Sequence, residues 1–245
     1  MSEEKKSKPG VLQLVMVGLL VVAAFAIGSM WTELRMLKGQ GGVMPQGDQV
    51  APGELPEEGI TELSEDQWQE VLSNPAFSMG EPEAAVVIVE FTDYQCPFCK
   101  RHIDETAGQI YENYVREGKV KYIYRDLPLP FHANAHLASQ AARCAGDQGK
   151  YLEYHDKLFE TQASWSEEEA AGLFKTYAGG LGLDQGQFDS CLDEEKYKQA
   201  VDDDLALAAK VEATGTPSFF INGKSLVGAQ PFAAFEIMIE EALGE

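Results

Sequence analysis

Two cysteines that closely follow an apolar run constrain the fold more than any other feature of this chain. The run Ala84–Phe91 reads AAVVIVEF, and Cys96-Pro97-Phe98-Cys99 then opens a segment with helical periodicity. A C-x-x-C motif between a strand and a helix is typical of thiol–disulfide redox sites, because this spacing lets two sulfurs meet across one helical turn. The partial positive charge at a helix N-terminus stabilises the thiolate of the first cysteine. The sequence therefore predicts a reactive thiol at Cys96.

The alternatives for this motif are half of a zinc site or a structural disulfide. Zinc normally needs two more close ligands, and the chain has no second C-x-x-C motif. His132 and His136 are four residues apart and could share a helix face, but no third ligand lies near them in the sequence. We therefore expect redox chemistry without a bound metal, and none of this chemistry calls for a dissociable cofactor.

The overall charge excludes one class of partner. The formal net charge is −21 at neutral pH and the calculated isoelectric point is about 4.5. A surface this acidic repels the phosphate backbone, so a nucleic-acid-binding role is excluded on electrostatic grounds.

The N-terminus predicts a membrane anchor. Residues 11–31 are apolar and contain no charged residue, and a stretch of this length can span a bilayer as a helix. A cleaved signal peptide is the alternative, since Ala24-Phe25-Ala26 fits the small-x-small cleavage pattern. Three lysines precede the span, so the positive-inside rule places residues 1–10 in the cytoplasm and the rest of the chain outside.

The remaining chain divides into a linker and one domain. Residues 32–80 read as a linker with a short helix at Leu63–Leu72, which Ser64 and Gln67 begin as a capping box. Residues 81–245 form an α/β domain that starts with a strand–helix–strand unit, at 84–91, 96–116 and 120–124. A helical block at about 130–212 follows, with helices expected at 133–146, 151–160, 166–178, 184–192 and 196–212. Asn222-Gly223 then predicts a β-hairpin before a final helix at 232–243.

Four separate motifs give the chain a resemblance to the DsbA-like family of thiol–disulfide oxidoreductases. They are EFTDYQCPFC at 90–99, RDLPLPFHANA at 125–135, AARCAGDQGKYLEYHDKLF at 141–159 and GTPSFFING at 215–223. The resemblance covers the chain from about Pro82 to the C-terminus. It implies a thioredoxin-like fold with an inserted helical domain.

The resemblance also implies roles for individual residues. Cys96 matches the attacking cysteine and Cys99 the buried resolving cysteine. Pro217, after Thr216, matches the family's cis-proline, whose neighbouring backbone could pair with an extended substrate. The residues expected to contact a substrate are therefore Pro97, Phe98, Thr216 and Pro217.

Glu90 lies six residues before Cys96, where this fold carries a buried acid behind the active site. Because burial penalises a charged carboxylate, such an acid can accept the proton of Cys99 through water. The alternative is a strand residue whose side chain simply reaches the edge of the sheet.

Phe98 departs from the best-known family pattern. The most oxidising members carry a histidine there, which can stabilise the thiolate electrostatically. The resemblance therefore implies a less oxidising disulfide in this chain. Lys100, Arg101 and His102 could partly replace the missing charge, or could form an ordinary solvated helix face.

Cys144 and Cys191 allow three interpretations: a second redox pair, a structural disulfide or two buried free thiols. We favour a structural disulfide, because disulfides persist in an oxidising compartment. The acidic run Asp202-Asp203-Asp204 is expected to be a solvated helix turn.

These observations predict a membrane-tethered, extracytoplasmic enzyme that introduces disulfides into unfolded exported proteins. The resemblance implies reoxidation by a membrane partner of the DsbB or vitamin-K-epoxide-reductase type, and we expect a monomer. A reductase or isomerase of the same fold is one alternative. The other is a non-catalytic module that holds extended peptides beside Pro217.

Overall fold

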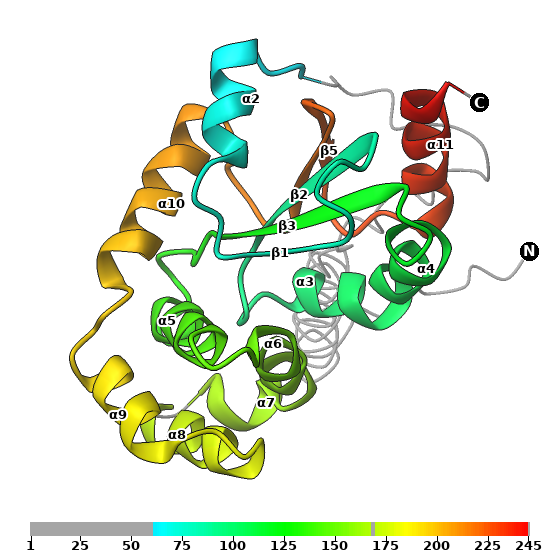
Figure 1. Cartoon of the computed structure of the whole chain (residues 1–245). Helices are drawn as coiled ribbons and strands as arrows, with labels where there is room; N and C mark the ends of the chain where they lie inside the picture. The colour runs from blue at the N-terminus through cyan, green and yellow to red at the C-terminus, as the bar shows by residue number, and fades with distance from the viewer. Residues whose placement is uncertain (1–60, 168–169, 245) are drawn as a thin grey trace, which may run out of the picture. The chain divides into compact units, whose positions relative to one another are not determined.

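The computed structural model describes residues 61–167 and 170–244 (Figure 1). The predicted segment 11–31 and most of the predicted linker lie outside these residues. Within the described ranges, no helix is both long and apolar enough to cross a bilayer.

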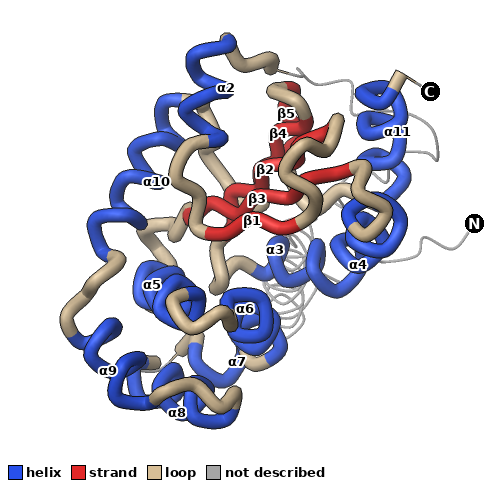
Figure 2. The backbone as a smooth tube through the Cα atoms, in the orientation of Figure 1, coloured by secondary structure: helices blue, strands red, loops and turns tan. Residues whose placement is uncertain are grey.

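A five-stranded mixed sheet forms the centre of the domain, with the strand order β1-β3-β2-β4-β5 (Figure 2). The two central strands β2 (Val86–Thr92) and β3 (Val120–Asp126) are parallel, as the strand–helix–strand pattern predicts. β4 (Ser218–Ile221) is antiparallel to β2, and β5 (Lys224–Val227) is antiparallel to β4. The predicted Asn222-Gly223 turn joins β4 to β5, and both of its residues have positive φ, which these two residue types tolerate best.

Two elements lie within the stretch that the sequence assigned to the linker. Helix α2 (Glu65–Leu72) begins with the predicted capping box of Ser64 and Gln67. The edge strand β1 (Phe77–Met79) was not predicted, because three residues are too few to show an alternating pattern. Since β1 is hydrogen-bonded to β3, residues 61–80 contribute to the sheet and to its helical cover.

The helical run after the cysteines connects β2 to β3. It consists of α3 (Pro97–His102), the π-helical segment η1 (Ile103–Ala107), α4 (Gly108–Ile110) and a second π-helical segment, η2 (Tyr111–Val115). The predicted apolar face packs inward, and Gly118 follows the run with a φ of +72°. The sequence predicted one regular helix here and did not reveal the two π-helical segments.

The remaining helices follow in the predicted order. They are α5 (Ala135–Gly146), α6 (Tyr151–Glu160), α7 (Gln162–Trp165), α8 (Ala171–Gly180), α9 (Gln185–Asp193), α10 (Lys198–Lys210) and α11 (Phe232–Leu243). The predicted helix at 166–178 is wrong in its limits. Trp165 already ends α7, α8 starts only at Ala171, and α8 continues two residues beyond the expected end, to Gly180.

The two faces of the sheet pack against different helices. Alternate residues such as Ile88 and Tyr122 face one core. This core is shared with the helical run from α3 to η2, with α11 and with the helices α5, α6, α8 and α9. The intervening residues, such as Val89 and Ile123, face a second core shared with α2 and α10. Figure 1 shows α10 on the same side of the sheet as α2, and its Asp204 is paired with Arg143 of α5. The last helix of the predicted insertion therefore covers the sheet itself.

Candidate active site

Cys96 is the N-cap residue of α3, and Pro97 occupies the first turn, where its fixed φ suits a helix and its missing N–H costs nothing. The Cys96 thiol donates to the carbonyl oxygen of Thr216, with Sγ and O 3.4 Å apart. Cys99 lies one turn further along and is fully buried, and its Sγ accepts the backbone N–H of Asp93 at 3.4 Å. Both thiols are free, so the structure shows the reduced site.

The two thiols have opposite acidities. A hydrogen bond from Cys99 is the main cause that lowers the pKa of Cys96 to about 6, with smaller contributions from Thr216 and from the backbone N–H groups of Cys99 and Phe98. Burial raises the pKa of Cys99 well above its ordinary value, and the hydrogen bond to Cys96 acts in the same direction. At neutral pH the site therefore holds a thiolate at Cys96 and a thiol at Cys99.

The loop that precedes β4 completes the site. The Thr216–Pro217 peptide bond is cis, in agreement with the family resemblance. The Pro217 carbonyl accepts the backbone N–H of Gly228 at 2.8 Å, which anchors the loop to the segment after β5. Because β4 pairs with β2, Thr216 reaches Cys96 although the two residues are 120 positions apart.

Three large apolar side chains are exposed among the described residues, Phe98, Phe131 and Val227, and the sequence had indicated only Phe98. Phe98 is 54% exposed and Pro97 is also exposed, as expected for residues that contact a substrate. Phe131 is 74% exposed on the loop between β3 and α5, and the sequence did not indicate it. Its position inside a Pro-rich loop was the available clue, since such a loop cannot bury a large side chain in regular structure.

Glu90 lies on central strand β2, opposite Tyr124 of β3 and Phe219 of β4. It is fully buried, so the alternative that its side chain reaches the sheet edge is wrong. Its Oε2 accepts a hydrogen bond from the Tyr122 hydroxyl at 2.7 Å, and its Oε1 has no hydrogen-bond partner among the described residues. Its role as a proton acceptor stays a prediction.

The three basic residues after Cys99 do not form a set of free charges beside the thiolate. Lys100 is paired with Asp104 at 2.9 Å. The Arg101 guanidinium stacks over the Phe98 ring at 5.2 Å and donates to the Ala229 carbonyl. His102 is fully buried, and burial lowers its pKa, so it is neutral at neutral pH. The solvated-face alternative is therefore also wrong for His102.

Several hydrogen bonds hold the loop between β2 and α3, which leads to Cys96. The sequence did not reveal them. The buried Asp93 carboxylate accepts the backbone N–H groups of Gln95 and Leu129 and a bond from His132 Nδ1, each at 2.7 Å. Gln162 of α7 donates through Nε2 to the carbonyls of Tyr94 and Cys96, at 2.8 and 3.1 Å. Except for Gln95, these partners come from distant parts of the chain, so local sequence patterns did not indicate them. Through Gln162, the helical insertion directly supports the loop that carries Cys96.

Cys144 and Cys191 form a disulfide, so the interpretation as two free thiols is wrong, and the structural role of the bond stays a prediction. Their Cα atoms are 5.9 Å apart, and the bond joins α5 to α9 within the insertion.

The two histidines that lie four residues apart, His132 and His136, have different partners. His132 binds Asp93, whereas His136 on α5 lies 3.0 Å from Asp202. In the part of the chain that the structure describes, no group of three metal-ligating side chains comes together.

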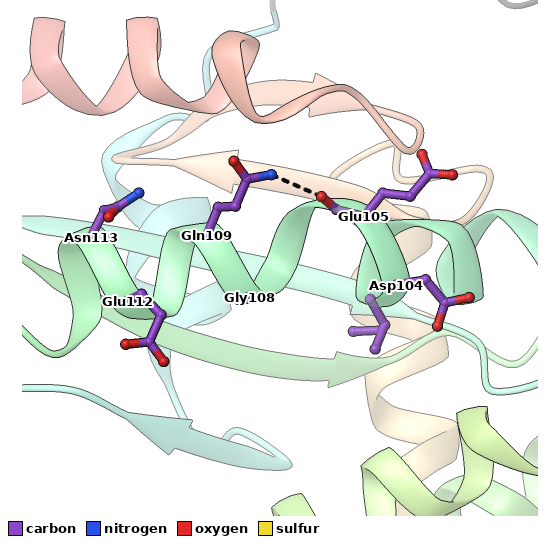
Figure 3. Close-up of a pocket in the computed structure, with 7 residues that line it drawn as sticks. Asp104, Glu105, Gly108, Gln109, Glu112 and Asn113 are labelled. Carbon is purple, nitrogen blue, oxygen red and sulfur yellow. Dashed lines mark hydrogen bonds between the residues drawn. The ribbon is translucent and has the colours of Figure 1, made fainter.

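A shallow pocket on the active-site helix contains none of the predicted site residues (Figure 3). It is lined by Ile103, Asp104, Glu105, Gly108, Gln109, Glu112 and Asn113. Two of its acids are paired with basic residues one turn away, Asp104 with Lys100 and Glu112 with Arg116.

Comparison with known proteins agrees with this geometry. The sequence model of the Thioredoxin family matches residues 73–241, so the chain belongs to the thioredoxin family. Oxidised BdbD of Bacillus subtilis superposes with a TM-score of 0.65 at 24% identity, over 76% of this chain and 98% of that one. A thioredoxin-like oxidoreductase of Silicibacter pomeroyi gives a TM-score of 0.61 at 26% identity, over 75% and 99% of the two chains.

One curated relative is named for disulfide chemistry. A Rickettsia typhi protein named for protein-disulfide oxidoreductase activity is 26% identical over 156 residues, which are 62% of this chain and 56% of that protein. Disulfide exchange is the activity in that protein's name, and this chain shares the thioredoxin fold and has a free C-x-x-C cysteine pair.

Other relatives carry a different name. The Na(+)/H(+) antiporter NhaA 1 of Salinispora arenicola is 30% identical over 164 residues, which are 66% of this chain and 24% of that protein. The chain thus spans about a quarter of the length of the curated antiporters that it matches. Antiport is the named activity of those longer proteins.

Proposed function

We propose that this chain is a membrane-anchored oxidase that works outside the cytoplasm and introduces disulfides into unfolded exported proteins. The observation that supports it best is the contrast between the lowered pKa of Cys96 and the raised pKa of Cys99. A stabilised Cys96 thiolate favours the reduced enzyme, and an enzyme with a stable reduced form is a strong disulfide donor.

The reaction begins with a substrate thiolate that attacks the Cys96 sulfur of the Cys96–Cys99 disulfide. The Cys96–Cys99 bond breaks, and Cys99 leaves as a thiolate that takes a proton from Glu90 through water. A second substrate thiolate then attacks the substrate sulfur of the mixed disulfide, and Cys96 leaves as a thiolate. Two electrons pass from the substrate to the cysteine pair, and the low pKa of Cys96 makes it a good leaving group.

The surroundings of the cysteines suit an unfolded substrate. The segment around the cis Thr216–Pro217 bond lies beside Cys96 and is where an extended chain would pair with the backbone. The exposed Phe98 ring provides apolar contact without demanding a particular side chain.

The cellular setting completes the proposal. The apolar segment 11–31 anchors the chain, and the lysines before it leave the domain outside the cytoplasm. A monomer reoxidised by a membrane protein of the DsbB or vitamin-K-epoxide-reductase type fits a donor that must be regenerated after each turnover.

The reduction potential of the Cys96–Cys99 pair tests the direction of electron flow. The full-length protein in detergent is equilibrated with glutathione buffers, and its free thiols are counted by mass spectrometry. We expect a value above about −200 mV, toward −120 mV. A value near about −270 mV would instead identify a reductase.

Replacement of Cys96 by serine separates catalysis from peptide holding. An oxidase loses all turnover in the C96S variant, because no mixed disulfide can form. A module that only holds peptides would not need Cys96. If the C96S variant still binds unfolded substrates, that result would favour the non-catalytic alternative.

A further inference from the structure

Three buried polar residues near the cysteines form a hydrogen-bonded chain. The proposed mechanism uses only one of them, Glu90. Glu90 of β2, Tyr122 of β3 and His102 of α3 are all fully buried. The Tyr122 hydroxyl lies 2.7 Å from Glu90 Oε2 and 3.3 Å from His102 Nε2. Two atoms at the ends of this chain, Glu90 Oε1 and His102 Nδ1, have no hydrogen-bond partner among the described residues.

The hydrogen-bond directions in this chain follow from the number of protons. A tyrosine hydroxyl has one hydrogen, and Tyr122 donates it to Glu90. Tyr122 can therefore only accept from His102, which must carry its proton on Nε2. Each bond points toward the Glu90 carboxylate, and a hydrogen bond to an ionised carboxylate favours that form.

Both partners of Glu90 in this chain are neutral. The His102 ring packs 4.6 Å from Phe219 and 5.3 Å from Phe235, and burial lowers its pKa. Burial also raises the pKa of Tyr122 well above its ordinary value, and Glu90 adds to that effect. Glu90 acts on the pKa of Tyr94, Cys99, His102, Tyr111, Tyr122 and Tyr124, and none of these six is a cation at neutral pH; His155 faces His102 from α6.

We propose that Tyr122 is a positioning residue for Glu90, and that His102 acts on Glu90 through the Tyr122 hydroxyl. The two neutral donors hold the Glu90 carboxyl group in one orientation, so that it can exchange a proton with Cys99. This proposal rests on the role of Glu90 in the proposed function. It concerns the step in which Cys99 becomes the nucleophile, which an oxidase and a reductase share.

That step can be written in full. The Cys99 thiol gives its proton to Glu90, and the resulting thiolate attacks the Cys96 sulfur of a mixed disulfide. The Cys96–Cys99 bond forms, the bond from Cys96 to its partner breaks, and the partner leaves as a thiolate with two electrons. Only an unprotonated carboxylate can accept the Cys99 proton, so the step slows when the acceptor is protonated.

The test follows this step with Ellman's reagent. The reduced full-length protein in detergent is mixed with excess reagent in a stopped-flow instrument. Cys96 releases one thionitrobenzoate as it forms the mixed disulfide, and Cys99 releases the second. The C99S variant gives only the first release and so assigns the two phases. The rate of the second release is measured against pH.

The Y122F variant removes the hydroxyl and keeps the ring. We expect the midpoint of the pH profile to move up by about one unit, because a lost hydrogen bond to a charged group has about that effect. The matched control is Y154F, which removes another buried hydroxyl, one that donates to the Phe174 carbonyl within the insertion. We expect Y154F to leave the midpoint unchanged.

The H102F variant provides an independent test, including the case in which Y122F fails to fold. We expect a smaller upward shift from H102F alone, and no further shift when it is added to Y122F. Shifts that add would show that His102 does not act through Tyr122. A Y122F midpoint equal to that of the unmodified protein would overturn the proposal.

Two further measurements separate this proposal from the proposed function. The E90Q variant should lose the pH-dependent phase, and if it does not, Glu90 is not the acceptor and both its assigned role and this proposal fail. If instead the reduction potential identifies a reductase while the Y122F shift is observed, the oxidase proposal fails and the role of Tyr122 stands.

Discussion

At the scale of single residues, the two cysteines of one motif differ in function because of where their hydrogen bonds and burial place them. Cys96 is the N-cap residue of α3 and lies beside Thr216, whereas Cys99 lies in the core near Glu90. A thiolate at the first position and a thiol at the second let each sulfur perform a different step of disulfide exchange.

The pH dependence of alkylation should report this difference. Because the pKa of Cys96 is lowered to about 6, its iodoacetamide alkylation should rise with pH around 6, well below the range of an ordinary thiol. The C99A variant removes the main hydrogen bond to the thiolate, so its midpoint should move upward. Mass spectrometry identifies the alkylated cysteine, and an unmoved midpoint in C99A would contradict the assigned cause.

Phe98 should limit the oxidising strength of the pair. In F98H, a histidine that can carry a positive charge replaces a neutral ring beside the Cys96 thiolate, so the pKa of Cys96 should fall. Each unit corresponds to an increase of about 30 mV in the reduction potential of this two-electron couple. F98L is the control, and its reduction potential should equal that of the unmodified protein. Equal reduction potentials in F98H and F98L would show that residue 98 has no electrostatic role.

At the scale of elements, a buried ionic network joins β3 to α5 and α10. Arg125 lies 2.6 Å from Asp204 Oδ1, and Arg143 lies 2.6 Å from Asp204 Oδ2 and 2.5 Å from Asp126 Oδ2. Arg125 also donates to the backbone carbonyls of Val71, Asn74, Ser73 and Glu70, at and just after the end of α2. The expectation that the whole acidic run is solvated is therefore wrong for Asp204, which is buried and links three elements.

The neighbouring acid supplies a matched pair of variants. D204N removes the charge that compensates two buried guanidinium groups, so it should lower the free energy of unfolding by about 3–5 kcal/mol. D203N changes an exposed side chain that accepts from Gln199, and it should alter stability by less than about 0.5 kcal/mol. Urea denaturation of both proteins measures the difference, and equal midpoints would show that the network adds no stability.

The disulfide in the insertion should stabilise the fold without taking part in turnover. It links residues 47 positions apart, so loss of both cysteines in C144A/C191A should lower the free energy of unfolding by about 3–4 kcal/mol. The pH profile of Cys96 alkylation should stay the same. A changed profile would indicate that the insertion transmits its redox state to the active site.

At the scale of the whole molecule, the chain combines the described domain with the apolar N-terminal segment. That segment lies outside the described residues, so the anchor and its orientation are proposals from residues 11–31 and the flanking lysines. The structure places residues 61–80 on the sheet, which leaves 32–60 as the part of the predicted linker before the first described element.

Membrane fractionation tests the anchor directly. We expect the full-length protein to stay with the membranes after alkaline carbonate extraction, because a spanning helix resists release, and a variant lacking residues 1–31 to appear in the soluble fraction. A membrane-impermeant maleimide applied to intact cells should label reduced Cys96 if the domain lies outside. A full-length protein that is released by carbonate, with a shortened N-terminus by mass spectrometry, would support a cleaved signal peptide.

The sequence by itself determined the features that depend on neighbouring residues. The apolar run before the C-x-x-C motif, the capping box at Ser64 and the Asn222-Gly223 turn are all local, and the structure contains the strand, the helix and the hairpin that they predict. The family motifs added Pro217 and Glu90, which no local pattern distinguishes.

Only the tertiary structure decided which distant groups meet. The Thr216 carbonyl beside Cys96, the Tyr122 hydroxyl on Glu90 and the Arg143 side chain on Asp204 each join residues 32 to 120 positions apart. The same long-range packing buried His102 and Asp204, which the sequence had grouped with solvated neighbours. Burial and hydrogen bonding set the charge of such groups, and both depend on contacts that chain order does not encode locally.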